Sequence, residues 1–111
     1  MKILLKLLAA GICVFMLTVT VRTSMEASLW SAWPAYAASP WAMATFWDAY
    51  SGFTLFWVWI AFRERSWGVR ILWLVLVYAL GNIATAAYLF VALNQLRPEQ
   101  PASDVLVRRP R

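Results

Sequence analysis

The chain has 111 residues, of which 63% are hydrophobic and only 14% are charged, and its formal net charge is +5. Soluble domains carry about 25% charged residues, so this composition excludes an ordinary soluble domain and indicates an integral membrane protein. The basic residues lie at the ends of apolar blocks and in the C-terminal tail, not on a basic face among exposed aromatic rings, which argues against nucleic acid as a partner.

The first apolar block predicts a transmembrane helix over residues 3–21, with Lys2 and Lys6 at its start. A cleavable signal peptide would need a small-residue cleavage site soon after the block. The nearest such site, Ala35-Tyr-Ala37, lies well beyond it. Retention as a span of about 28 Å is therefore favoured over cleavage.

The connection over residues 22–39 contains Trp30, Trp33 and Tyr36 at spacings of three. Rings at this spacing share one side of a helical turn and are expected among the lipid headgroups. We expect an interfacial segment anchored by these rings; a dedicated binding feature is the less favoured alternative.

The second transmembrane helix is predicted over residues 40–65, where Ser39 is a suitable cap and Pro40 a suitable first helical residue. A helix of this length measures about 39 Å and exceeds the hydrocarbon core of about 30 Å. Asp48 is therefore expected near the boundary of the core. An ionisable residue at membrane depth is a candidate functional residue.

The third helix is predicted over residues 71–93, and residues 97–111, with three prolines and mixed charges, read as a disordered tail. Residues 1–96 would then form one all-α domain of three transmembrane helices. More basic residues flank the side of the N-terminus, so the positive-inside rule predicts a cytoplasmic N-terminus. An odd number of spans then predicts the C-terminus outside.

A polar stripe in the third predicted helix gives the candidate site. Antiparallel packing would bring Asp48 level with this stripe, and Gly52 and Gly81 would let the two backbones approach closely. The residues of this predicted intramembrane cluster are Asp48, Asn82, Thr85, Tyr88 and Tyr78. Packing glue between helices is the leading interpretation, followed by a ligand-, proton- or substrate-handling site, and then by a docking face for a partner.

Three arginines, Arg63, Arg65 and Arg70, surround the connection between the second and third predicted helices. They are expected to set the topology, and headgroup binding is the alternative. The chain has no histidine and one cysteine, Cys13, inside an apolar block. No catalytic residue, metal site or cofactor is predicted, and an enzyme is the less favoured class.

Short motifs in the apolar blocks resemble a family of small bacterial membrane proteins known as a domain of unknown function. The motifs are Pro40-Trp41, Asp48-Ala-Tyr50-Ser-Gly52 and Leu80-Gly81-Asn82-Ile-Ala84-Thr-Ala86 with Tyr88. The resemblance implies about 100 to 110 residues with three spans in the bacterial inner membrane, and it implies no catalytic residues.

The favoured function is therefore an accessory or assembly component of a membrane complex, embedded in the lipid bilayer. A membrane protein partner or a homo-oligomer would fit this function. Two alternatives stay open: a small oligomeric transporter that couples protons through Asp48, and a lipid-modifying enzyme or helper.

Overall fold

The computed structural model describes residues 2–106, and within this range it contains helices and no strand. The all-α class is confirmed. The elements in chain order are α1 (Lys2–Glu26), α2 (Leu29–Ala38), α3 (Pro40–Arg63), α4 (Trp67–Leu80), α5 (Asn82–Asn94) and the 3-10 helix η1 (Ala102–Leu106).

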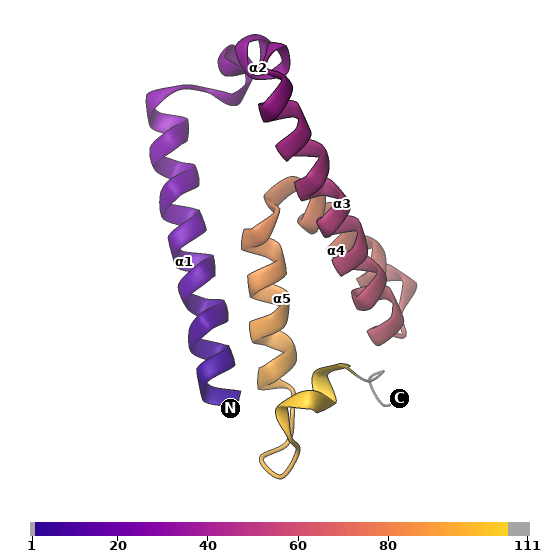
Figure 1. Ribbon diagram of the computed structural model, residues 1–111. Helices are drawn as coiled ribbons and strands as arrows, with labels where there is room; N and C mark the ends of the chain where they lie inside the picture. Colours follow the sequence, from indigo (N-terminus) through magenta and orange to yellow (C-terminus); the bar gives the residue numbers. More distant parts are fainter. Residues whose placement is uncertain (1, 107–111) are drawn as a thin grey trace.

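The helices run back and forth along one long axis (Figure 1). Helix α1 leads away from the N-terminus, α2 lies at the far end, and α3 returns. Helix α4 runs antiparallel to α3, and α5 then runs back between α1 and the α3–α4 pair. Ser28 and Ser39 start α2 and α3, because each side chain accepts a backbone N–H in the first turn of its helix.

The single helix expected over residues 71–93 is wrong, because the chain reverses at Gly81 and forms a helical hairpin. Gly81 has φ 60° and ψ −127°, a conformation that side chains with a Cβ rarely adopt. Its N–H closes α4 by donating to the Val77 carbonyl, and its own carbonyl accepts from Ala84 and Thr85 at the start of α5. Gly81 is thus the C-cap of α4 and the N-cap of α5.

Of the helices within residues 2–106, α1 is both long enough and apolar enough to cross a membrane. A signal sequence near an N-terminus has the same length and composition. Helix α3 has 24 residues, but its apolar side chains are interrupted by tryptophan, threonine, serine, glycine and Asp48. Helices α4 and α5 are apolar and short, with 14 and 13 residues. Three separate spans are therefore not supported by length and composition.

The core lies where α5 packs against its neighbours. Its most deeply buried side chains are Ile60, Val77, Tyr88 and Leu93. Helix α1 packs on α5 through a line of partly or fully buried residues at helical spacing, Leu5, Ala9, Cys13 and Met16. Beyond Met16 all residues of α1 are exposed, because α5 begins only at Asn82 and gives the second half of α1 nothing to pack on.

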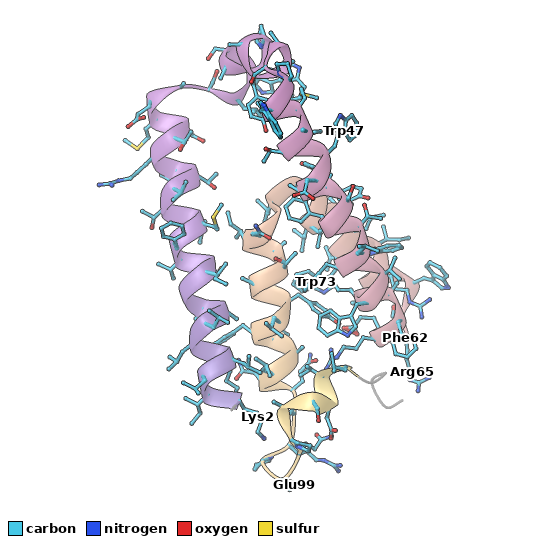
Figure 2. All side chains as sticks on the ribbon, in the orientation of Figure 1. Lys2, Trp47, Phe62, Arg65, Trp73 and Glu99 are labelled. Atoms are coloured by element: carbon cyan, nitrogen blue, oxygen red, sulfur yellow. The ribbon has the colours of Figure 1, made fainter. Side chains whose placement is uncertain are left out.

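The start of α1 lies beside the segment that follows α5. The Lys2 ammonium donates to the backbone carbonyls of Arg97 and Pro98, at 3.1 and 3.2 Å. Figure 2 shows Lys2, Arg65 and Glu99 at one end of the molecule and Trp47 toward the other. The hairpin at Gly81 is the cause, since it returns α5 to the side on which α4 began.

The tail is also more ordered than expected. Residues 102–106 form η1, and the Val105 side chain is buried in the main core cluster. The prediction of a disordered tail is therefore wrong for this segment, and residues 107–111 lie outside the described residues.

Candidate functional site

An open hollow of about 370 Å³ lies between α3 and the first turn of α5. Its polar lining comes from Asp48 on α3 and from Asn82 and Thr85 on α5. The rest of the lining is small or aromatic: Ala49, Gly52, Phe53 and Phe56. The structure thus brings together three of the five polar residues that the sequence singles out, although not through the straight helix that the prediction assumed.

A second hollow of about 250 Å³ adjoins the first and shares Phe56, Asn82 and Thr85 with it. Its other walls are apolar and come from α1 and α5: Leu8, Ala9, Ile12, Ala86 and Leu89. Together the two hollows make a groove over the first turns of α5, with α1 on one side and α3 on the other. One end of this groove is polar and the other is apolar.

The first turn of α5 presents Asn82 and Thr85 in a fixed arrangement. The Thr85 hydroxyl lies 3.2 Å from the backbone carbonyl of Asn82 and 3.3 Å from its side-chain oxygen, and it donates to both. The Asn82 side chain is exposed to the groove. This end of the groove therefore offers an amide and a carboxylate to an occupant.

Tyr78 lies apart from Asp48, on the α4 arm of the hairpin. Its hydroxyl is 2.6 Å from the Thr54 hydroxyl, and its backbone carbonyl accepts the Tyr50 hydroxyl at 2.9 Å. That carbonyl belongs to the last turn of α4, where no intrahelical donor is available. Side chains of α3 thus complete the end of α4, and Tyr78 has a clear structural role.

Tyr88 also lies apart from Asp48, buried further along α5 with 1% of its surface exposed. Three rings, Phe56, Trp59 and Trp73, meet it edge to face, with the Trp73 centroid 4.9 Å away. Figure 2 shows Trp73 inside the bundle. The Tyr88 hydroxyl accepts from the Arg63 guanidinium at 3.1 Å.

Residues 3–109 match a protein family described as "Protein of unknown function (DUF1475)". The chain belongs to this family. No curated protein and no solved structure matches it. In this DUF1475 chain the family match extends over all five α-helices, the hairpin and η1.

The three arginines of the DUF1475 chain that the sequence assigns to topology have different surroundings. Arg63 is buried, with 3% of its surface exposed, and its Nε donates to the Val105 carbonyl at 2.7 Å. Arg70 donates twice to the Glu64 carbonyl, at 2.7 and 3.0 Å, and stacks over Trp67. Arg65 is exposed. Headgroup binding by Arg63 would require this buried contact with the tail to open.

Sequence reasoning missed the polar cluster around Arg63. Glu64 is 4% exposed and Val105 is 6% exposed, and neither residue carries a motif. The contact across 42 positions, from Arg63 to Val105, brings the tail to this cluster. Within residues 2–106 no group of three histidine, cysteine, aspartate or glutamate side chains gathers as metal ligands would.

The two glycines expected to face each other do not do so. A Cβ on Gly81 would lie 3.0 Å from Cζ of Phe53, so the close approach is between a backbone and a ring. A Cβ on Gly52 would meet nothing within 4 Å, which leaves the floor of the Asp48 hollow open.

Proposed function

We propose that the protein is an integral membrane protein that acts as a component of a larger membrane assembly. The membrane is the bacterial inner membrane. Helix α1, helix α3 and the α4–α5 hairpin enter it, and both chain ends lie in the cytoplasm. The observation that carries the proposal is the hairpin turn at Gly81. It lies part-way along the length of α1 and places polar groups beside a groove.

The exposed surface supports insertion. Large apolar side chains stand out from every long helix, such as Phe15 on α1, Leu55 on α3 and Val75 on α4, each at least 60% exposed. A monomeric soluble protein rarely exposes apolar surface so widely. Exposed tryptophans occur at both ends, Trp30 and Trp41 near α2 and Trp67 at the start of α4, as expected for rings at two membrane–water boundaries.

The orientation rests on the basic residues of the described chain. The end at which α1 begins and α5 finishes has six of them, and the end near α2 has Arg22. The six are Lys2, Lys6, Arg63, Arg65, Arg70 and Arg97. The positive-inside rule assigns the end with more lysine and arginine to the cytoplasm. Because the hairpin brings Arg97 to this end, the excess of basic residues at this end is larger than it would be for three straight spans.

The depth of the turn supports membership of an assembly. Asn82 and Thr85 share a hollow with Leu8 and Ile12, which lie about 9 and 15 Å along α1 from its first residue. Irregular backbone is tolerated at such depth only where protein or water covers it, since each unsatisfied polar group in hydrocarbon costs several kcal/mol. A neighbouring protein over the groove would supply this cover.

The test is the protein mass of the tagged chain, extracted in mild detergent and measured by light scattering that subtracts the detergent. We expect at least twice the 12.7 kDa of one chain. A photo-reactive amino acid at position 82 should give protein adducts, whereas the same group at Leu4, an exposed residue of α1, should label lipid. A single-chain mass together with lipid adducts alone from position 82 would contradict the proposal.

A second candidate function, transport through the Asp48 hollow, is favoured by the open polar lining around Asp48. If water reaches this hollow, Gly52→Cys should react with a membrane-impermeant thiol reagent in a Cys13→Ala background. The new side chain has room, because nothing lies within 4 Å of a Cβ at Gly52. Leu55→Cys, on the exposed apolar surface of the same helix, is the matched control and should stay unlabelled. Equal, slow labelling at both positions would remove the transport candidate.

A further inference from the structure

Two side chains of opposite charge, Arg22 on α1 and Asp48 on α3, lie unpaired on the half of the molecule near α2. Within residues 2–106 neither makes an ion pair or a hydrogen bond through its charged group; the ion pair between Arg97 and Glu99 lies at the opposite end. Ionisable side chains inside membranes are rare and usually pair with one another. Asp48, eight residues into α3, therefore calls for a partner beyond those that its own chain supplies, and Arg22 is a cation available to pair with it.

Arg22 cannot reach the Asp48 of its own chain. The line of α1 that faces α5 runs through Ala9, Cys13 and Met16, and a period of 3.6 residues continues it to Thr20. Arg22 lies two residues further, about 200° around the helix from Thr20. Its side chain consequently points away from the groove in which its own Asp48 lies.

The two charges match in depth. Helices α1 and α3 meet α2 at the same end of the molecule (Figure 1). Arg22 is about 6 Å from that end of α1, and Asp48 is about 12 Å from the start of α3, at 1.5 Å per residue. The difference of about 6 Å is within the span of an extended arginine side chain, which readily snorkels along a helix.

We infer that Arg22 of a second copy of this chain pairs with Asp48 at the polar end of the groove. This inference rests on the proposed function and names the neighbour in the assembly. The exposed second half of α1, with Leu17, Val19 and Val21, would pack beside α3 of the other copy and cover the turn at Gly81. A second copy supplies both the charge and the apolar helix that the groove lacks.

Glu26 is the competing acid for Arg22, since it lies four residues along the same helix. The two side chains line a shallow surface hollow with Met25 and are exposed there. Glu26 ends α1 one turn beyond Arg22, further from the groove. An exposed pair of this kind contributes little, so it does not replace a partner for Asp48, which faces the groove.

The test uses two differently tagged copies of the full chain in one membrane, both with Cys13→Ala. One copy carries Arg22→Cys and the other carries Asp48→Cys. A bifunctional thiol reagent with a spacer of the length of an arginine side chain should join them into a product with both tags. The matched control replaces Arg22→Cys by Thr20→Cys, at the same depth on the opposite side of α1, and should give at least about fivefold less product.

The outcomes separate this inference from the proposed function. Equal yields from positions 20 and 22 would overturn the pairing. Absence of the doubly tagged product, with an assembly larger than one chain in the same membranes, would overturn the pairing and leave the proposed function standing. A single-chain mass together with lipid adducts alone from position 82 would overturn both.

Charge reversal gives a second, independent test of the pairing. Arg22→Asp alone and Asp48→Arg alone should each weaken self-association about tenfold or more, since each places like charges together. The two changes combined in one chain should restore association. A combined variant that self-associates no more strongly than either single variant would contradict the pairing. If Asp48→Arg fails to insert, the cross-linking of the two cysteine variants decides the question.

Discussion

Replacing Gly81 by alanine is expected to destroy the α4–α5 hairpin. At φ 60° and ψ −127° a residue with a Cβ is strained by about 1–3 kcal/mol. The new methyl group would also lie 3.0 Å from Cζ of Phe53. Alanine at the same time favours continuous helix by about 1 kcal/mol over glycine. Both effects destabilise the turn relative to a continuous helix.

The variant has a specific alternative structure. A continuous helix from Trp67 to Asn94 would measure about 42 Å, enough to cross a bilayer. A C-terminal reporter should therefore move, in a substantial fraction of molecules, to the face opposite the N-terminus. Gly52→Ala is the control, because a Cβ there meets nothing within 4 Å, and its reporter should not move. A Gly81→Ala chain with unchanged stability and reporter location would show that the turn needs no glycine.

Replacing Arg63 by leucine is expected to lower the free energy of unfolding by about 2–4 kcal/mol. The buried guanidinium donates to the Val105 carbonyl and to the Tyr88 hydroxyl. Without it, two buried acceptors lose a charged donor. Denaturant titration in mixed micelles measures the loss, and limited proteolysis should cut near residues 102–106 faster, because Val105 loses the contact that holds its backbone.

Two further variants separate this effect from the loss of any charge. Arg97→Leu removes an exposed pair with Glu99, whose side chains are 73% and 67% exposed, and should change stability little. Tyr88→Phe removes the hydroxyl that Arg63 contacts, so the double variant with Arg63→Leu should lose less stability than the sum of the two single losses. Strict additivity would mean that Arg63 and Tyr88 act independently.

The helical class and several element starts were predictable, and the hairpin was not. Ser39-Pro40 starts α3 because a serine cap and a proline in the first turn act locally. The reversal at Gly81 needed tertiary information, since residues 71–93 read as one apolar stretch. Glycine is a strong local signal for an interruption of regular structure, and Gly81 was the available hint. Whether the chain reverses there depends on Phe53 and Tyr50, which pack on the turn from another helix.

The candidate site was partly predictable for the same reason. Antiparallel pairing of α3 with the chain after Arg70 is present in the structure, with Thr54 beside Tyr78. Beyond Gly81 the direction reverses, so Asn82 and Thr85 meet Asp48 from a second helix, and Tyr88 is carried toward Arg63. The burial of Arg63 depends on the tail, through a contact that no local pattern encodes.

The location of the two chain ends tests the account most directly. Reporters that are active on only one side of the membrane, fused in turn to the N-terminus and the C-terminus of the unaltered chain, should both report the cytoplasm. This follows from the hairpin at Gly81 and from the contacts of Lys2 with the carbonyls of Arg97 and Pro98. A cytoplasmic N-terminus with a C-terminus on the outer side would contradict the hairpin.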